Sequence, residues 1–243
     1  MSLHVHASPE AVLHSLAQYF VTQAQAAIAD HGRFSVALSG GNSPRKLYEL
    51  LAATPYREQV AWDKVYFFFG DERNVPATDP ESNYRMAREA LLNPLAIADA
   101  QVFPVDTALP PAEAAEAYAR TIQNFFAPDK AVFDLVLLGL GDNSHTASLF
   151  PHTPVLHETS VGAREVFVEE KQTFRITLTA PLLNQAQAVA FLVYGADKAA
   201  AVQQVIQGAR NVEEFPAQLI APAGELHWFL DMAAAAALLP AAS

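Results

Sequence analysis

The chain has 243 residues, of which 51% are hydrophobic and 17% are charged, so it is long and apolar enough to bury a substantial core. It contains no cysteine, which excludes disulfides and cysteine-ligated zinc, and its net charge of −11 argues against nucleic acid, which needs clustered Lys and Arg. No apolar run reaches membrane-spanning length, and no basic region followed by an apolar block opens the chain, so we expect no membrane segment, no signal peptide and a cytoplasmic protein.

The first half of the chain alternates helical patterns with short apolar strands. Ser8 and Pro9 supply the N-cap and the first residue of a helix that reaches about Asp30. Further helices are expected at 44–53, 79–92 and 111–126, and strands at 34–38, 65–69 and, more weakly, 101–105.

The second half opens with a near-continuous apolar run over 133–140, as expected for a strand buried on both faces of a parallel sheet. Gly139 and Gly141 allow a sharp turn, and a short segment over 145–150, read as the start of a helix, is ended by Pro151.

The remaining segments continue the alternation to the end of the chain. We find no repeat and no linker, so we expect one α/β domain over residues 1–243 with a mostly parallel sheet. The expected elements are an edge strand at 166–168 in a loop region over 154–172, strands at 175–179, 189–194 and 227–230, and helices at 197–207 and 232–239.

His145 stands where ligands bind in open α/β sheets, at the carboxyl end of a central strand. A helix beginning there would attract anions, and imidazole titrates near neutral pH, as a general base must. The alternative is a capping turn with an incidental histidine.

A glycine-rich loop follows the strand at 34–38. Gly40, Gly41, Asn42 and Ser43 lead into a helix, and such a loop can cradle a phosphate with its main-chain N–H groups. It is not a P-loop, because GxxxxGK[ST] is absent, and a purely structural turn remains an equal alternative.

Charged residues follow other strands. Asp71 and Arg73 come directly after the strand at 65–69, either as site residues or as an exposed ion pair. Arg175 enters one strand and Lys198 opens a helix, so both are candidate anion contacts, whereas Arg45 is expected to be a solvated helix residue.

Two other kinds of site fit poorly. His145, His152 and His157 are spaced by seven and five residues and are interrupted by prolines, which does not favour zinc. No serine lies in the G-x-S-x-G frame of a serine hydrolase.

Taken together, the motifs LSGGNSP, FFGDERNVP with SNYRMA, GLGDNSHTASLFP, RITLTAPLLNQA, GADKAAAV and PAQLI resemble the 6-phosphogluconolactonase family in order and spacing, from about Ser8 to Leu230. The resemblance implies a Rossmann-like, three-layer α/β fold shared with glucosamine-6-phosphate deaminase and ribose-5-phosphate isomerase. It also implies hydrolysis of 6-phospho-D-glucono-1,5-lactone to 6-phosphogluconate in the pentose phosphate pathway, without metal or cofactor. The expected partner is thus a small sugar-phosphate lactone, and we expect a monomer or weak homo-oligomer.

The resemblance also assigns roles to residues. His145 becomes the base and Arg73 the active-site arginine, with Asp71 beside them. The phosphate contacts fall on Gly40 to Ser43, Arg175 and Lys198.

One departure from the family pattern stands next to the base. The usual run is Asp-Gly-His, whereas this chain has Asn143-Ser144-His145. Asn143 can hydrogen-bond the imidazole but carries no charge, so Asp142 or Asp71 would have to compensate.

Two alternative functions remain. A glucosamine-6-phosphate deaminase-like enzyme is implied to need an acidic residue five positions after the histidine, where this chain has Phe150. A non-catalytic regulator that binds sugar phosphates could keep every phosphate contact.

These assignments make a spatial and a pH prediction. His145, Asp71, Arg73 and the loop from Gly40 to Ser43 should meet in one cleft at the carboxyl edge of the sheet. The rate should fall below about pH 6, where an ordinary imidazole becomes protonated.

Overall fold

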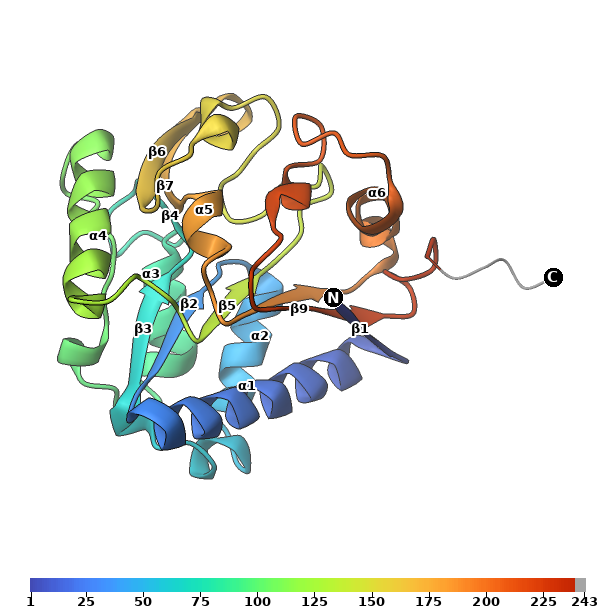
Figure 1. Cartoon of the computed structure of the whole chain (residues 1–243). Helices are drawn as coiled ribbons and strands as arrows, with labels where there is room; N and C mark the ends of the chain where they lie inside the picture. The colour runs from blue at the N-terminus through green and yellow to red at the C-terminus, as the bar shows by residue number, and fades with distance from the viewer. Residues whose placement is uncertain (239–243) are drawn as a thin grey trace.

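A six-stranded parallel sheet forms the middle layer of the protein, whose residues 1–238 are described by a computed structural model (Figure 1). Every neighbouring pair in the order β1-β9-β8-β5-β2-β3 is parallel, which confirms the α/β class. The strands are β1 (Ser2–His6), β2 (Phe34–Leu38), β3 (Val65–Phe69), β5 (Leu135–Leu138), β8 (Ala188–Val193) and β9 (Glu225–Asp231).

Both faces of this sheet are buried, which is why its strands are apolar without alternation. Val36 and Leu38 pack into the core beneath one face, whereas Ala37 between them packs into the core on the other. Helices cover both faces: α1 (Pro9–His31), α2 (Asn42–Leu51), α3 (Asn83–Ala87), α4 (Pro111–Phe126), α5 (Ala180–Leu183) and α6 (Ala199–Gln207). The expected three-layer arrangement is therefore confirmed.

A small antiparallel sheet lies beside the carboxyl end of the main one. Its strands run in the order β4 (Asp71–Arg73), β7 (Thr173–Leu178) and β6 (Ala163–Val168). Gly70 alone separates the end of β3 from the start of β4, so the chain leaves the parallel sheet and enters the antiparallel one directly. Figure 1 shows the β6–β7 hairpin above the ends of the central strands.

Chain reversal in the main sheet occurs between β2 and β5. The chain runs from β2 to β3 on one side and then crosses to β5 on the other, and Val36 pairs with Leu135. This is a topological switch point, where the loops that follow two neighbouring strands diverge and leave room for a ligand. The glycine-rich loop and the His145 loop are those two loops.

The local capping residues act as expected. The Ser8 hydroxyl accepts a hydrogen bond from the Ala11 N–H at 3.2 Å, and α1 ends at Gly32, whose φ is 84°. Between residues 1 and 238 no helix is long and apolar enough to cross a membrane.

Several expected elements differ in the structure. The helix expected at 79–92 begins only at Asn83, because Asp79 is engaged in a turn with Glu81 and Ser82 provides the cap. The strand expected at 101–105 is reduced to one bridge between Phe67 and Val102, since Pro104 has no N–H to extend a ladder.

Two further corrections concern the chain ends. The strand β1 was not expected, and its partner β9 comes from the opposite end of the sequence. The helix expected at 232–239 is a series of turns over 232–238, and Leu239 lies outside the described residues.

Candidate active site

A tight turn, rather than a helix, follows His145. The Leu149 N–H donates to the Thr146 carbonyl at 2.9 Å and these two residues form an antiparallel bridge, so 146–149 is a four-residue hairpin turn. The helix expected to begin here is wrong. Ala147 at the tip has φ 47°, and such a turn sets the residues on either side of it, His145 and Phe150, opposite each other.

The His145 ring has one nitrogen engaged and one free for chemistry. Its Nδ1 lies 2.5 Å from the Asn143 Oδ1, which also accepts the His145 main-chain N–H at 3.2 Å. Because a main-chain N–H only donates, the facing atom of Asn143 must be the oxygen, so Nδ1 carries the proton and Nε2 is the basic nitrogen. A side chain at Gly141 would overlap His145 Nδ1, so this position needs glycine.

Burial keeps this imidazole neutral. It lowers the pKa of His145 to about 4, as do the positive charges of Arg175 and Lys198, while Asp71 and Asp142 oppose the shift. The neutral, basic form is therefore present above about pH 4, and the fall in rate that we expected below pH 6 moves to more acidic pH.

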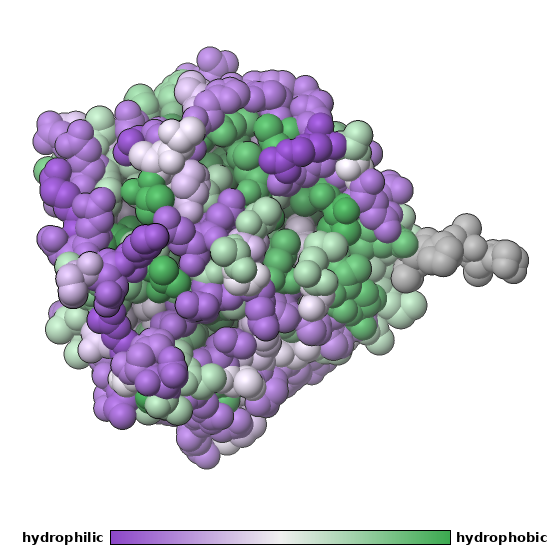
Figure 2. Space-filling view, in the orientation of Figure 1, coloured by the Kyte–Doolittle hydropathy of each residue, from purple (hydrophilic) through white to green (hydrophobic). Residues whose placement is uncertain are grey.

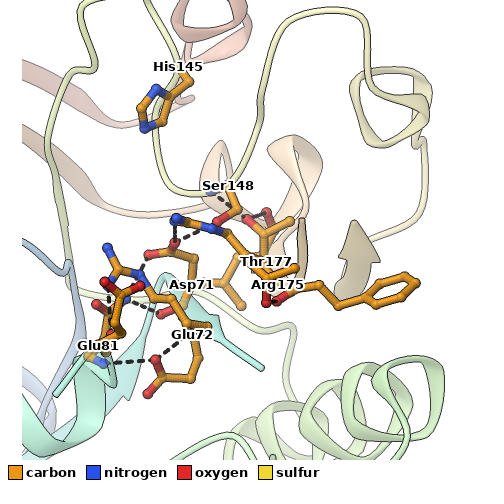
Figure 3. A network of polar contacts seen from close by, with 12 residues as sticks. Asp71, Glu72, Glu81, His145, Ser148, Arg175 and Thr177 are labelled. Carbon is orange, nitrogen blue, oxygen red and sulfur yellow. Dashed lines mark hydrogen bonds and ion pairs between the residues drawn. The ribbon is translucent and has the colours of Figure 1, made fainter. Parts of the chain in front are cut away.

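Asp71 is the centre of a buried network below the histidine (Figure 3). Its carboxylate is only 6% exposed, accepts the Ser148 hydroxyl at 2.6 Å, and lies 3.7 Å from Arg175 Nη1. Its other oxygen accepts from Asn83 Nδ2 at 3.2 Å. These partners engage both oxygens, and the ion pair ties Asp71 to the Arg175 guanidinium.

Arg73 and Arg175 lie directly opposite each other across the antiparallel pair β4–β7. Like charges in that position repel, so an anion between or beside them is favoured. Each side chain also has a buried Nε–H with no partner among residues 1–238, although Arg73 donates through Nη1 to the Glu81 carbonyl at 2.6 Å. The pair therefore offers unused donors to an anionic ligand.

Glu72, between Asp71 and Arg73 in sequence, points to the other side and organises α3. It accepts the main-chain N–H groups of Asn83 and Tyr84, each at 2.8 Å, and the Ser82 hydroxyl at 3.2 Å. Burial raises its pKa, and these hydrogen bonds oppose the shift. Glu72 thus has a structural role at the start of a helix, where negative charge is stabilising.

The glycine-rich loop and Arg73 line one cavity together. Gly41 and Asn42, at the start of α2, line a space of about 390 Å³ together with Arg45 and Arg73. Gly40 lies against Asn83, and a side chain at Gly40 would overlap the Asn83 amide. Ser43, which follows Asn42, is the second residue of α2 after the N-cap Gly41. Arg45 forms an exposed pair with Glu49 at 3.1 Å, as a solvated helix residue should.

The expected site residues thus fall into two groups. The first group surrounds His145, whose imidazole feels the charges of Asp71, Arg175, Asp142 and Lys198. Lys198 forms an ion pair with Asp197 at 3.5 Å.

The other group is the glycine-rich loop with Arg73. The cross-strand position of Arg73 beside Arg175 joins the two groups. Asp142, Asn143 and Phe150 line a different cavity, of about 1040 Å³. Of the residues that we expected in one cleft, Gly41, Asn42 and Arg73 line the cavity of about 390 Å³, whereas His145 and Asp71 line neither of these two cavities. Residues of the β6–β7 hairpin and of α6 line the larger cavity. Figure 2 shows apolar surface between hydrophilic residues in the region where Figure 1 shows these elements.

Sequence reasoning missed the residues that hold this arrangement together. Ser148 and Asn83 bind Asp71, and Phe150 stacks on His145 with ring centroids 4.1 Å apart. Of these contacts, the sequence could have indicated the one between His145 and Phe150, because residues that flank a four-residue turn face each other.

The other histidines do not converge on a metal. His152 pairs with Glu214 at 3.1 Å and His157 with Glu213 at 3.2 Å, both near the surface. Among residues 1–238, no group of three or more His, Asp or Glu side chains is placed to hold a metal ion.

The sequence and fold match known proteins over nearly their whole length. The family model for glucosamine-6-phosphate isomerases/6-phosphogluconolactonase matches residues 7–228. The chain belongs to this family.

Relatives in the glucosamine-6-phosphate isomerase/6-phosphogluconolactonase family support the match. A 6-phosphogluconolactonase of Synechocystis is 44% identical over 90% of each chain, and one of Bos taurus is 40% identical over 96% of this chain and 92% of that one. The solved 6-phosphogluconolactonase of Trypanosoma brucei has a TM-score of 0.86 and 32% identity, and 98% of each chain is covered. A monomeric glucosamine-6-phosphate deaminase is 17% identical with a TM-score of 0.81, a likeness that shows the fold alone.

Proposed function

We propose that this protein hydrolyses 6-phospho-D-glucono-1,5-lactone to 6-phosphogluconate, the lactone-opening step of the oxidative pentose phosphate pathway, with His145 as general base. The observation that carries the proposal is a neutral imidazole whose Nε2 has no partner among residues 1–238 and which feels the charge of Arg175, the residue opposite Arg73 across β4–β7. Relatives at 40–44% identity that are named 6-phosphogluconolactonase support the substrate.

His145 would act on the attacking water. As the water oxygen bonds to the lactone carbonyl carbon, Nε2 takes its proton, and the carbonyl oxygen becomes negative. When the bond from that carbon to the ring oxygen breaks, the imidazolium returns the proton to the ring oxygen, which leaves as a hydroxyl. The product at this point is a carboxylic acid, which releases the second proton of the water to solvent and becomes a carboxylate, and His145 is neutral again.

The arginines would stabilise the negative charges. We assign the phosphate to Arg175, Lys198 and the main-chain N–H groups from Gly40 to Ser43, and the developing oxyanion to Arg73. Asp71 would fix the position of Arg175, because its carboxylate is buried and already hydrogen-bonded.

Phe150 weighs against the deaminase alternative. The ring stands where the resemblance implies an acidic residue in that enzyme, and it covers the imidazole instead of exchanging protons with it. No observation favours the regulator.

The test is hydrolysis of freshly generated 6-phosphogluconolactone with the spontaneous rate subtracted. His145→Gln should lower kcat by about 10²–10⁴-fold, the usual contribution of general-base catalysis. His152→Gln is the matched control, since the His152 side chain is exposed and forms an ion pair with Glu214, and it should leave kcat unchanged. A folded His145→Gln protein with wild-type kcat would remove His145 from the mechanism.

A further inference from the structure

Phe150 contacts both ends of the candidate site. Its ring stacks on the His145 imidazole with centroids 4.1 Å apart and planes 17° apart. The guanidinium carbon of Arg175 lies 5.3 Å from the centroid of the same ring. Because the two groups touch one flat side chain, they cannot be further apart than these two distances together.

The Phe150 ring is itself fixed. It is only 6% exposed and belongs to the hydrophobic core on that face of the sheet. The turn from Thr146 to Leu149 sets its backbone opposite that of His145, and the Thr153 hydroxyl donates to the Phe150 carbonyl at 2.6 Å. A buried aromatic ring with two torsions held on both sides is a rigid spacer.

We propose that Phe150 is a positioning residue that sets the separation between the His145 imidazole and the Arg175 guanidinium, and so matches the site to a lactone whose carbonyl and phosphate lie at that span. The inference rests on the proposed function, in which His145 acts at the carbonyl and Arg175 holds the phosphate. Asn143 fixes the rotation of the imidazole and Asp71 fixes the guanidinium, and Phe150 touches both groups.

Charged groups alone do not set this geometry. The groups that act on His145 are Asp71, Arg175, Asp142 and Lys198, of both signs and from several elements, and none of them is hydrogen-bonded to the imidazole. The hydrogen bond to Asn143 and the flat contact with Phe150 therefore together hold the ring plane in place. It also covers one face of the imidazole and keeps water from it.

The test replaces the flat ring and keeps the apolar volume. Phe150→Leu should lower kcat for the phosphorylated lactone by about tenfold to a hundredfold, since a displacement of about 1 Å between reacting groups costs that much. KM should change by less than about twofold, because the phosphate contacts of Arg175 stay. Phe150→Tyr, which keeps the ring, should restore kcat to near the wild-type value.

A matched control separates positioning from packing. Phe126 on α4 is also a phenylalanine with 6% exposure, and its aromatic partners are other phenylalanines. Phe126→Leu should lose a similar amount of thermal stability and keep kcat. If Phe150→Leu keeps wild-type kcat, or if Phe150→Tyr is as impaired as Phe150→Leu, the proposal is overturned.

A spectroscopic readout keeps the inference apart from the proposed function. In NMR spectra, the imidazole ¹⁵N signals of His145 report its tautomer and its hydrogen bond to Asn143 and are little affected by the ring current of Phe150; they should move in Phe150→Leu, but not in Phe150→Tyr or Phe126→Leu. Unchanged His145 signals in Phe150→Leu overturn the positioning role even if lactonase activity is absent. Displaced signals support it in the same case, so failure of the proposed function is recognised by the activity assay alone.

Discussion

Replacing Asn143 with aspartate should change the pH dependence of catalysis without changing the shape of the site. Asn143 Oδ1 lies 2.5 Å from His145 Nδ1, and a carboxylate oxygen in the same place would still accept that hydrogen bond. The difference is one negative charge beside the ring. That charge stabilises imidazolium and therefore raises the pKa of His145.

The size of the shift follows from the distance between charge centres. At about 4 Å, two unit charges interact by about 1 kcal/mol in water and about 4 kcal/mol at an effective dielectric constant of about 20. One pKa unit corresponds to about 1.4 kcal/mol, so the expected shift is about one to three units. The pKa of His145 in the native protein is about 4, and it should rise to between about 5 and 7 in Asn143→Asp.

The assay is the pH profile of kcat/KM, which reports the free enzyme. The base acts only when neutral, so raising its pKa moves the acid limb to higher pH. Asn143→Asp should lose activity at pH about 5 and retain it at pH about 8. Asp142→Asn is the matched control in the opposite direction, because Asp142 raises the pKa of His145 and its loss should lower that pKa. An acid limb in Asn143→Asp that coincides with the wild-type limb would refute the reasoning.

Three further changes test other parts of the structure. Arg175→Ala should raise KM for the phosphorylated lactone by about tenfold or more through loss of a charge-assisted contact, measured against Arg120→Ala on the surface of α4, and an equal KM in both variants would place the phosphate elsewhere. Ser144→Gly should raise the free energy of unfolding by up to about 1 kcal/mol in urea titrations, because Ser144 has φ 62°, a conformation that glycine adopts without strain; a loss of stability would contradict this. Asp134→Ala should lower the free energy of unfolding by about 1–3 kcal/mol, since the buried Ser35 N–H and hydroxyl, each bound at 2.7 Å, lose their acceptor, and an unchanged value would mean that water replaces it.

The fold was largely predictable because its signals are local. The helix at 111–126 and the strands at 34–38 and 65–69 have the predicted bounds, since an apolar run of strand length and a proline at a helix start are legible without knowledge of their partners. The strand β1 was not predictable in this way. Leu3 and Val5 are 45% and 40% exposed, so its sequence does not show a buried face, and it is a strand only because β9 lies beside it.

The candidate site was predictable in its residues but less so in its geometry. His145 was expected at a strand end, but the loop on either side of it depends on positive φ at Ser144 before it and at Ala147 in the hairpin turn after it, which neither residue type predicts. The opposition of Arg73 and Arg175 could not be seen either. It follows from the pairing of β4 with β7, segments about a hundred residues apart in the sequence.

The pairing of β1 with β9 has a consequence for how the protein is made. β1 spans residues 2–6, and its partner spans 225–231, so β1 has no partner in the sheet until the chain up to β9 has been synthesised. Strands β2, β3, β5 and β8 pair with one another before β9 is synthesised, and they do not need β1 for this pairing. Synthesis should therefore pass through a long-lived stage in which the sheet stands without its outer edge and the exposed backbone of residues 2–6 is open to chaperones or to other nascent chains.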